Sequence, residues 1–126
     1  MANGRHTNYE CNFGCSVEAA LEVIGGKWKG VILFHLVSGT KRFNEIRRLI
    51  PNATQRMVTL QLRELEADGI VERKIYQQIP PRVEYSLTEF GRSLEPILLL
   101  MRDWGNEYLE QIVERRRSQQ PVAAEQ

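Results

Sequence analysis

Residues 52–69 read "NATQRMVTLQLRELEADG", a stretch that predicts one helix. Thr54 can cap the start of this helix, and Gly69 can end it. Arg56 then falls in the first turn and three acids fall in the last two turns, whereas the helix macrodipole favours acids first and bases last. A local rule that is broken without local benefit is typical of a functional surface.

The two faces of this helix have different compositions. At helical spacing, the predicted core face holds Met57, Val58, Leu62 and Leu65. The opposite face suits the DNA major groove, where arginine reads guanine, glutamine reads adenine, threonine contacts several bases and leucine contacts the thymine methyl. The predicted base contacts are Gln55, Arg56, Thr59 and Leu60. Gln61 lies between the faces and is either a flanking polar residue or a DNA-backbone contact.

Positive charge is concentrated around this helix although the net charge of the chain is only +1. Between Lys41 and Arg63 there are six basic residues and one acid, Glu45. Such a block can attract a polyanion even on a nearly neutral molecule. The predicted contacts to the DNA backbone are Lys41, Arg42, Arg47, Arg48, Thr54, Arg63 and, beside the hairpin loop, Arg82, for which the minor groove is the alternative.

Each of these residues alone has a simpler explanation. Arg56 could be an ordinary solvated side chain, and Glu66 and Asp68 could pair with Arg73 or Lys74. The order of the elements favours the DNA-binding interpretation, because a short helix, a turn, a helix with a polar N-terminal face and a β-hairpin follow one another as in a winged helix-turn-helix.

Periodicity gives the remaining elements. The apolar residues predict helices over 16–24, capped by Ser16, and over 27–37 and 43–50. From Ile70 the period changes to two, which predicts a hairpin with strands in "IVERKIY" and "RVEYSL" around the loop "QQIPP". A last helical region opens at Thr88 and is expected to kink or split at Pro96 and Gly105. The fold class is therefore mainly α with a small β-hairpin wing (α+β), in one domain over residues 1–117 with a disordered tail over 118–126.

Composition bounds the class of protein. A chain of 126 residues can hold one core, and no apolar run approaches the roughly 18 residues of a membrane span. The start, "MANGRHTNYE", has no apolar segment typical of a secretory signal, so we expect a cytoplasmic protein with no membrane partner. Two cysteines four residues apart are too few for a disulfide-stapled secreted fold.

Five motifs spread over about Cys15 to Gly105 resemble the HxlR-type winged-helix transcriptional regulators of bacteria, relatives of the MarR group. The motifs are "EVIGGKWKGVILFHL", "RFNEIRRLIP", "LQLRELEADGIVER", "PPRVEYSLTEFGRSL" and "DWG". The resemblance implies a homodimer formed by the first and the C-terminal helices, with each recognition helix in one half of a pseudo-palindromic double-stranded DNA operator. Independently, "LEPILLLMRDWGNEYLEQI" has more apolar surface than one monomer of this size needs.

The resemblance also draws attention to Cys15, since several members sense oxidants or reactive electrophiles through a cysteine just before the first helix. A helix N-terminus stabilises a thiolate and so raises its reactivity. This sequence departs from the family pattern, because Ser16 follows where proline is common and Cys11 is an additional thiol. Cys11 could resolve an oxidised Cys15, or Cys15 could be a small buried apolar residue at the dimer interface.

Two other functions compete with gene regulation. One is a winged-helix protein-interaction module that binds an acidic partner, and the other is a small thiol enzyme. The enzyme is disfavoured because there is no Cys-x-x-Cys and neither His6 nor His35, which is expected in the core, offers an evident base. No cofactor is expected. A metal site can be drawn from His6, Glu10, Cys11 and Cys15, but the spacing lacks the pairs of structural zinc motifs.

Overall fold

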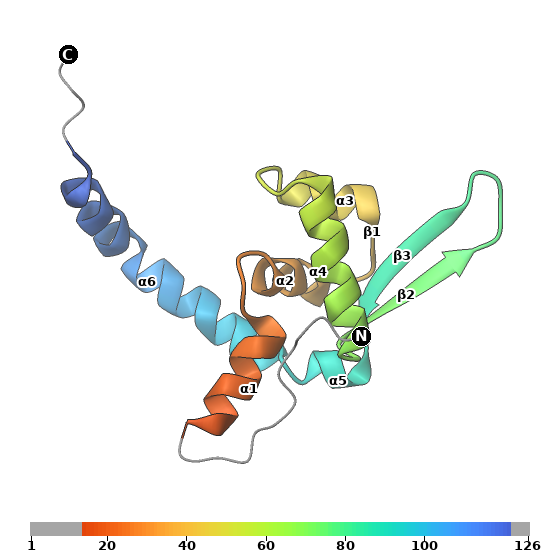
Figure 1. Ribbon diagram of the computed structural model, residues 1–126, viewed down its shortest axis with the longest axis horizontal. Helices are drawn as coiled ribbons and strands as arrows, with labels where there is room; N and C mark the ends of the chain where they lie inside the picture. The colour runs from red at the N-terminus through yellow and green to blue at the C-terminus, as the bar shows by residue number, and fades with distance from the viewer. Residues whose placement is uncertain (1–13, 122–126) are drawn as a thin grey trace. The chain divides into compact units, whose positions relative to one another are not determined.

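The computed structural model describes residues 14–121, and these form two compact units that meet at the bond between Glu95 and Pro96 (Figure 1). The first unit contains α1 (Cys15–Ile24), α2 (Lys29–Val37), β1 (Lys41–Arg42), α3 (Phe43–Leu49), α4 (Gln55–Ala67), β2 (Val71–Tyr76), β3 (Arg82–Leu87) and α5 (Glu89–Arg92). The second unit consists of α6 (Glu95–Gln119) from Pro96 onward and the residues after it.

The helix-turn-helix is α3 and α4, which pack on a shared core. The fully buried side chains that join α2, α3 and α4 are Ile32, Leu33, Leu36, Ile46, Val58, Leu62 and Leu65. Thr54 caps α4 as predicted, because its Oγ1 accepts a hydrogen bond of 3.1 Å from the backbone N–H of Met57. Gly69 follows the C-terminal end with a φ of 77°, a conformation that favours glycine.

The cap of α4 gives a first testable effect. Replacing Thr54 by alanine removes the acceptor for the Met57 N–H, so we expect a loss of about 1 kcal/mol in the free energy of unfolding without DNA. Urea denaturation at fixed protein concentration measures it. Thr40→Ala, at an exposed threonine before β1, is the matched control and should change stability by less than about 0.5 kcal/mol. Equal losses in the two variants would contradict the capping role.

The wing is a sheet of three antiparallel strands in the order β1-β3-β2. The predicted hairpin of β2 and β3 is confirmed, with Val71 opposite Leu87 at its base and Tyr76 opposite Arg82 near the loop. Figure 1 shows the hairpin extending away from the helices of its unit. Strand β1 was not predicted, because two residues are too short for a periodic signal. It places Lys41 opposite Tyr85 and Arg42 opposite Glu84.

Several helix boundaries differ from the sequence-based expectation, and α2 begins at Lys29 and not at residue 27. Helix α1 begins one residue before Ser16, and its N-cap is Gly14, whose carbonyl accepts from the N–H of Glu18. The C-terminal helical region breaks between α5 and α6, ahead of Pro96, and α6 runs through Gly105 without interruption. Pro96 is tolerated because it is the second residue of α6, where a helix needs no N–H donor. Helix α6 ends at Gln119, so the first two residues of the expected tail are helical.

Candidate nucleic-acid interface

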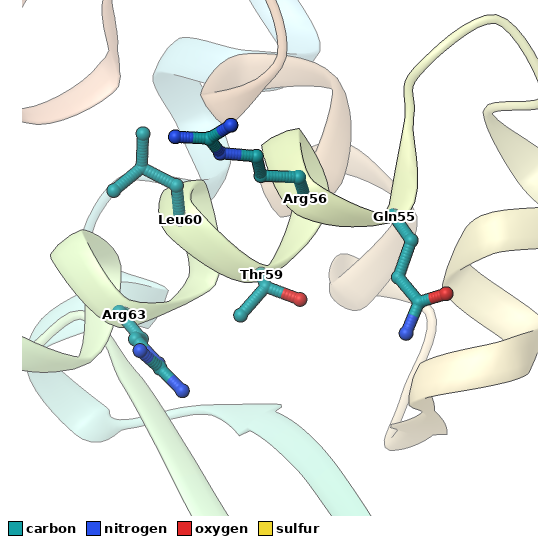
Figure 2. A pocket seen from close by; sticks show the side chains of 5 residues that line it. All are labelled: Gln55, Arg56, Thr59, Leu60 and Arg63. Carbon is teal, nitrogen blue, oxygen red and sulfur yellow. The ribbon is translucent and has the colours of Figure 1, made fainter.

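The front half of α4, together with Arg63 just behind it, presents an acid-free face. Gln55, Arg56 and Arg63 are exposed, Leu60 is 47% exposed and Thr59 is half-buried. These five side chains line one shallow hollow (Figure 2). Arg56 and Leu60 project from one side of the helix ribbon, and Gln55, Thr59 and Arg63 project from the other (Figure 2). The structure therefore brings the four predicted base-reading residues together on one surface.

Two acids in the rear half of α4 form ion pairs with basic residues of neighbouring elements. Glu64 Oε1 lies 2.7 Å from Lys29 Nζ of α2, and Glu66 Oε1 lies 3.5 Å from Arg73 Nε of β2. The simpler explanation for Glu66, a pairing with Arg73, is thus confirmed. Internal pairing explains why acids occur where the macrodipole disfavours them, and it leaves the charge of Arg56 at the front without an acid on its own face.

Gln61 was placed wrongly between the two faces. It belongs to the core face of α4, where it is only 9% exposed, while Met57, predicted in the core, is 38% exposed. The helix is rotated slightly from the predicted orientation, so that Gln61 replaces Met57 beside Val58 and Leu65. Gln61 is therefore not available as a DNA-backbone contact.

A second basic surface joins α3 to the wing. The side chains that line this hollow include Arg42, Arg48 and Arg82. Arg82 is the first residue of β3, where its guanidinium lies 4.2 Å from the centre of the Tyr76 ring and its Nε lies 3.3 Å from Glu84 Oε2. This Nε is covered but not aligned for a hydrogen bond to the carboxylate. Stacking and charge hold the side chain at the stem of the wing.

The acid inside the basic block has a local task. Glu45 Oε1 accepts a hydrogen bond of 2.7 Å from the backbone N–H of Arg42, at the start of α3. This contact resembles half of a capping box, in which an acid at the third helical position reaches back to the N-cap. Glu45 is therefore directed toward the helix terminus while it shares the hollow with the arginines.

Two other predicted backbone contacts are turned partly toward the protein. Arg47 is half-buried, and its Nε is covered without a hydrogen-bond partner. Lys41 Nζ lies 3.2 Å from Ser38 Oγ, which itself donates to the carbonyl oxygen of His35.

His35 was expected in the core but is only half-buried. Burial, and secondly the charge of Lys41, lower the pKa of His35.

Cys15 is the first residue of α1 and is 8% exposed. It is disulfide-bonded in the structure. Cys11, the chain's other cysteine, lies outside the described residues, as do His6 and Glu10 of the metal set. Within residues 14–121 no three His, Cys, Asp or Glu side chains gather as a metal site would need.

The fold and this surface define a class of protein, the winged helix-turn-helix. Residues 23–113 match the model of the HxlR-like helix-turn-helix family, and the chain belongs to that family. It is 64% identical over 99 residues to YdeP, an uncharacterised HTH-type transcriptional regulator of Bacillus subtilis, a match that covers 79% of this chain and 77% of the relative. The predicted family and fold class are thereby confirmed.

Solved structures of a redox regulator, HypR, are similar in fold and sequence. The oxidised form has a TM-score of 0.72 and 67% identity, covering 74% of this chain and 96% of the other. The reduced form has a TM-score of 0.75 and 62% identity, covering 79% and 98%. The protein is a transcriptional regulator by these relationships. In the described part of the chain no helix is both long and apolar enough to cross a membrane.

Proposed function

We propose that the protein binds one class of operator DNA as a homodimer and that cysteine oxidation controls this binding. The observation that supports operator reading best is the front half of α4, where Gln55, Arg56, Thr59 and Leu60 form an acid-free surface on a helix whose back is fixed in the core. These side chains are matched to base edges in the major groove. The amide groups at the capped N-terminus of α4 add donors for a phosphate.

The backbone contacts divide by exposure. Arg42 and Arg48 are exposed and share a hollow with Arg82, so we assign them to the phosphates beside the wing. Arg63 and Thr54 flank the base-reading surface and reach the adjoining backbone. Arg47 and Lys41 contribute mainly through their positive potential, because each is half-buried.

A homodimer accounts for apolar side chains that each unit leaves exposed. On α1, Val17 and Leu21 are exposed. On α6 the exposed apolar residues are Ile97, Leu100, Met101, Trp104, Tyr108, Leu109 and Val113. Apolar surface of this extent marks an association site, and a twofold dimer offers two recognition helices to half-sites about 34–36 Å apart.

Oxidation is the proposed signal because the regulator HypR, similar to this chain, is known in both an oxidised and a reduced form. Two thiols become a disulfide by giving two electrons and two protons to an oxidant, and a quinone that accepts them becomes a hydroquinone. Cys15, disulfide-bonded at the start of α1, is the proposed redox residue, and Cys11 is its proposed partner.

Oxidation should change DNA binding only when Cys15 is present. We expect the operator affinity of the reduced wild type to change on treatment with diamide or a quinone and to return with dithiothreitol. Cys15→Ser should show the same affinity before and after treatment. Gel-shift titrations measure both proteins, with Ser16→Ala as the matched control that keeps the thiol. An equal response of wild type and Cys15→Ser would exclude Cys15 as the sensor.

Operator selection distinguishes gene regulation from a protein-interaction module. Duplexes selected from a random pool by the wild type should converge on a sequence with two related halves. A module that binds an acidic protein partner would select no sequence, because its affinity for DNA would be purely electrostatic.

A further inference from the structure

A buried ion pair lies behind the recognition surface. Among residues 14–121, Lys29 is the only charged residue that is buried, with 7% of its side chain exposed. Its Nζ lies 2.7 Å from Glu64 Oε1, whose side chain is 21% exposed. The pair joins the first residue of α2 to the rear half of α4.

A second buried polar side chain lies one turn earlier on the same side of α4. Gln61 is 9% exposed, and its Oε1 is covered without a hydrogen-bond partner. This oxygen is 3.5 Å from the position that a Cβ would occupy at Gly26, whose φ is 85°. Gln61 and Glu64 therefore both face the short segment from Gly26 to Lys29, which leads from α1 into α2.

The apolar contacts of α4 do not explain these polar groups. Val58, Leu62 and Leu65 are buried at 1% exposure or less and supply the apolar anchorage. The hydrophobic effect is non-directional, so apolar burial by itself defines the rotation of the helix about its axis less sharply than an ion pair at hydrogen-bond distance does. A buried ion pair adds little stability over an apolar pair but can fix one arrangement.

We infer that Lys29, Glu64 and Gln61 are positioning residues that set the rotation of α4 about its axis and thereby decide which exposed side chains meet the bases. This inference rests on the proposed function. The buried positioning residues are next to exposed residues of the DNA-facing surface in the chain, because Gln61 follows Leu60 directly and Glu64 follows Arg63. A rotation that moves the rear contacts moves the front residues by the same angle.

The test separates positioning from stability. In Lys29→Met/Glu64→Leu both charges are removed together and the side-chain volumes are nearly kept, so the thermal midpoint should stay or rise. The ratio of affinities for the selected operator and a random duplex should fall by roughly tenfold, comparable to one lost base contact. The matched control is Arg73→Met/Glu66→Leu, which removes the more exposed ion pair between α4 and β2. It should keep this ratio within about twofold.

Each outcome has a defined meaning. If the wild type shows no preference for its selected operator, the proposed function fails. If the wild type discriminates and Lys29→Met/Glu64→Leu discriminates equally well, the positioning inference is overturned. If that double variant has no cooperative thermal transition, the operator preference of Gln61→Met tests the positioning inference instead. This substitution removes the buried amide at nearly constant side-chain volume. A fall in its operator preference supports positioning, and an unchanged preference overturns it.

Discussion

Arg56→Ala is expected to weaken binding to the selected operator by about 1 to 3 kcal/mol, which is roughly 5- to 150-fold, and to leave binding to random duplex nearly unchanged. Arg56 is exposed in the first turn of α4, and the acids of the same helix at Glu64 and Glu66 are paired behind it. Its guanidinium can therefore make a bidentate contact with a guanine edge. Fluorescence anisotropy at fixed salt concentration measures both affinities.

Arg48→Ala is the matched control for charge. It also removes one exposed arginine from the helix-turn-helix, but from the hollow beside the wing, where we expect phosphate contacts. It should weaken operator and random duplex alike and reduce the salt slope of binding by about one unit. If Arg56→Ala behaves as Arg48→Ala does, Arg56 contacts the backbone and does not read bases.

Leu62→Ala is expected to lower the free energy of unfolding by about 2 to 5 kcal/mol, the range for truncating a buried leucine. Leu62 is 1% exposed in the core face of α4. The change leaves a cavity among Val58, Leu65 and the buried residues of α2, which cannot fully close because both helices are held at several points. Urea denaturation without DNA and at fixed protein concentration measures the loss, since dimer stability depends on concentration.

Leu60→Ala is the corresponding control on the same helix. Leu60 is 47% exposed, so its truncation should change stability by less than about 0.5 kcal/mol. Its effect should appear instead in the preference for operators that present a thymine methyl. Similar destabilisation by both substitutions would show that the assignment of the two faces of α4 is wrong.

The recognition helix and its surroundings were predictable because they depend on local signals. Thr54 and Gly69 mark the ends of α4, and Val58, Leu62 and Leu65 repeat at helical spacing. The hairpin was predictable for the same reason, since its alternation and the two prolines of its loop are contained in the segment itself. The period of two did not by itself locate the buried residues of the wing, because Ile75 in β2 is 54% exposed.

The features that sequence reasoning missed depend on residues far apart in the chain. From the sequence alone Lys29 is indistinguishable from a solvated lysine. Its ion pair with Glu64 exists only because α2 packs against α4. Strand β1 exists because Lys41 and Arg42 pair with β3 more than forty residues later. Gln61 is a core residue because the turn at Gly26 lies against its side of α4, which no signal near Gln61 in the sequence indicates.

Methylation interference on the selected operator tests the central claim most directly, because methylation at guanine N7 blocks the major groove. We predict two clusters of interfering guanines, about 10 base pairs apart, and the loss of interference at one position in each cluster with Arg56→Ala. Operator binding that is insensitive to N7 methylation at every position, or an identical pattern for wild type and Arg56→Ala, would contradict it.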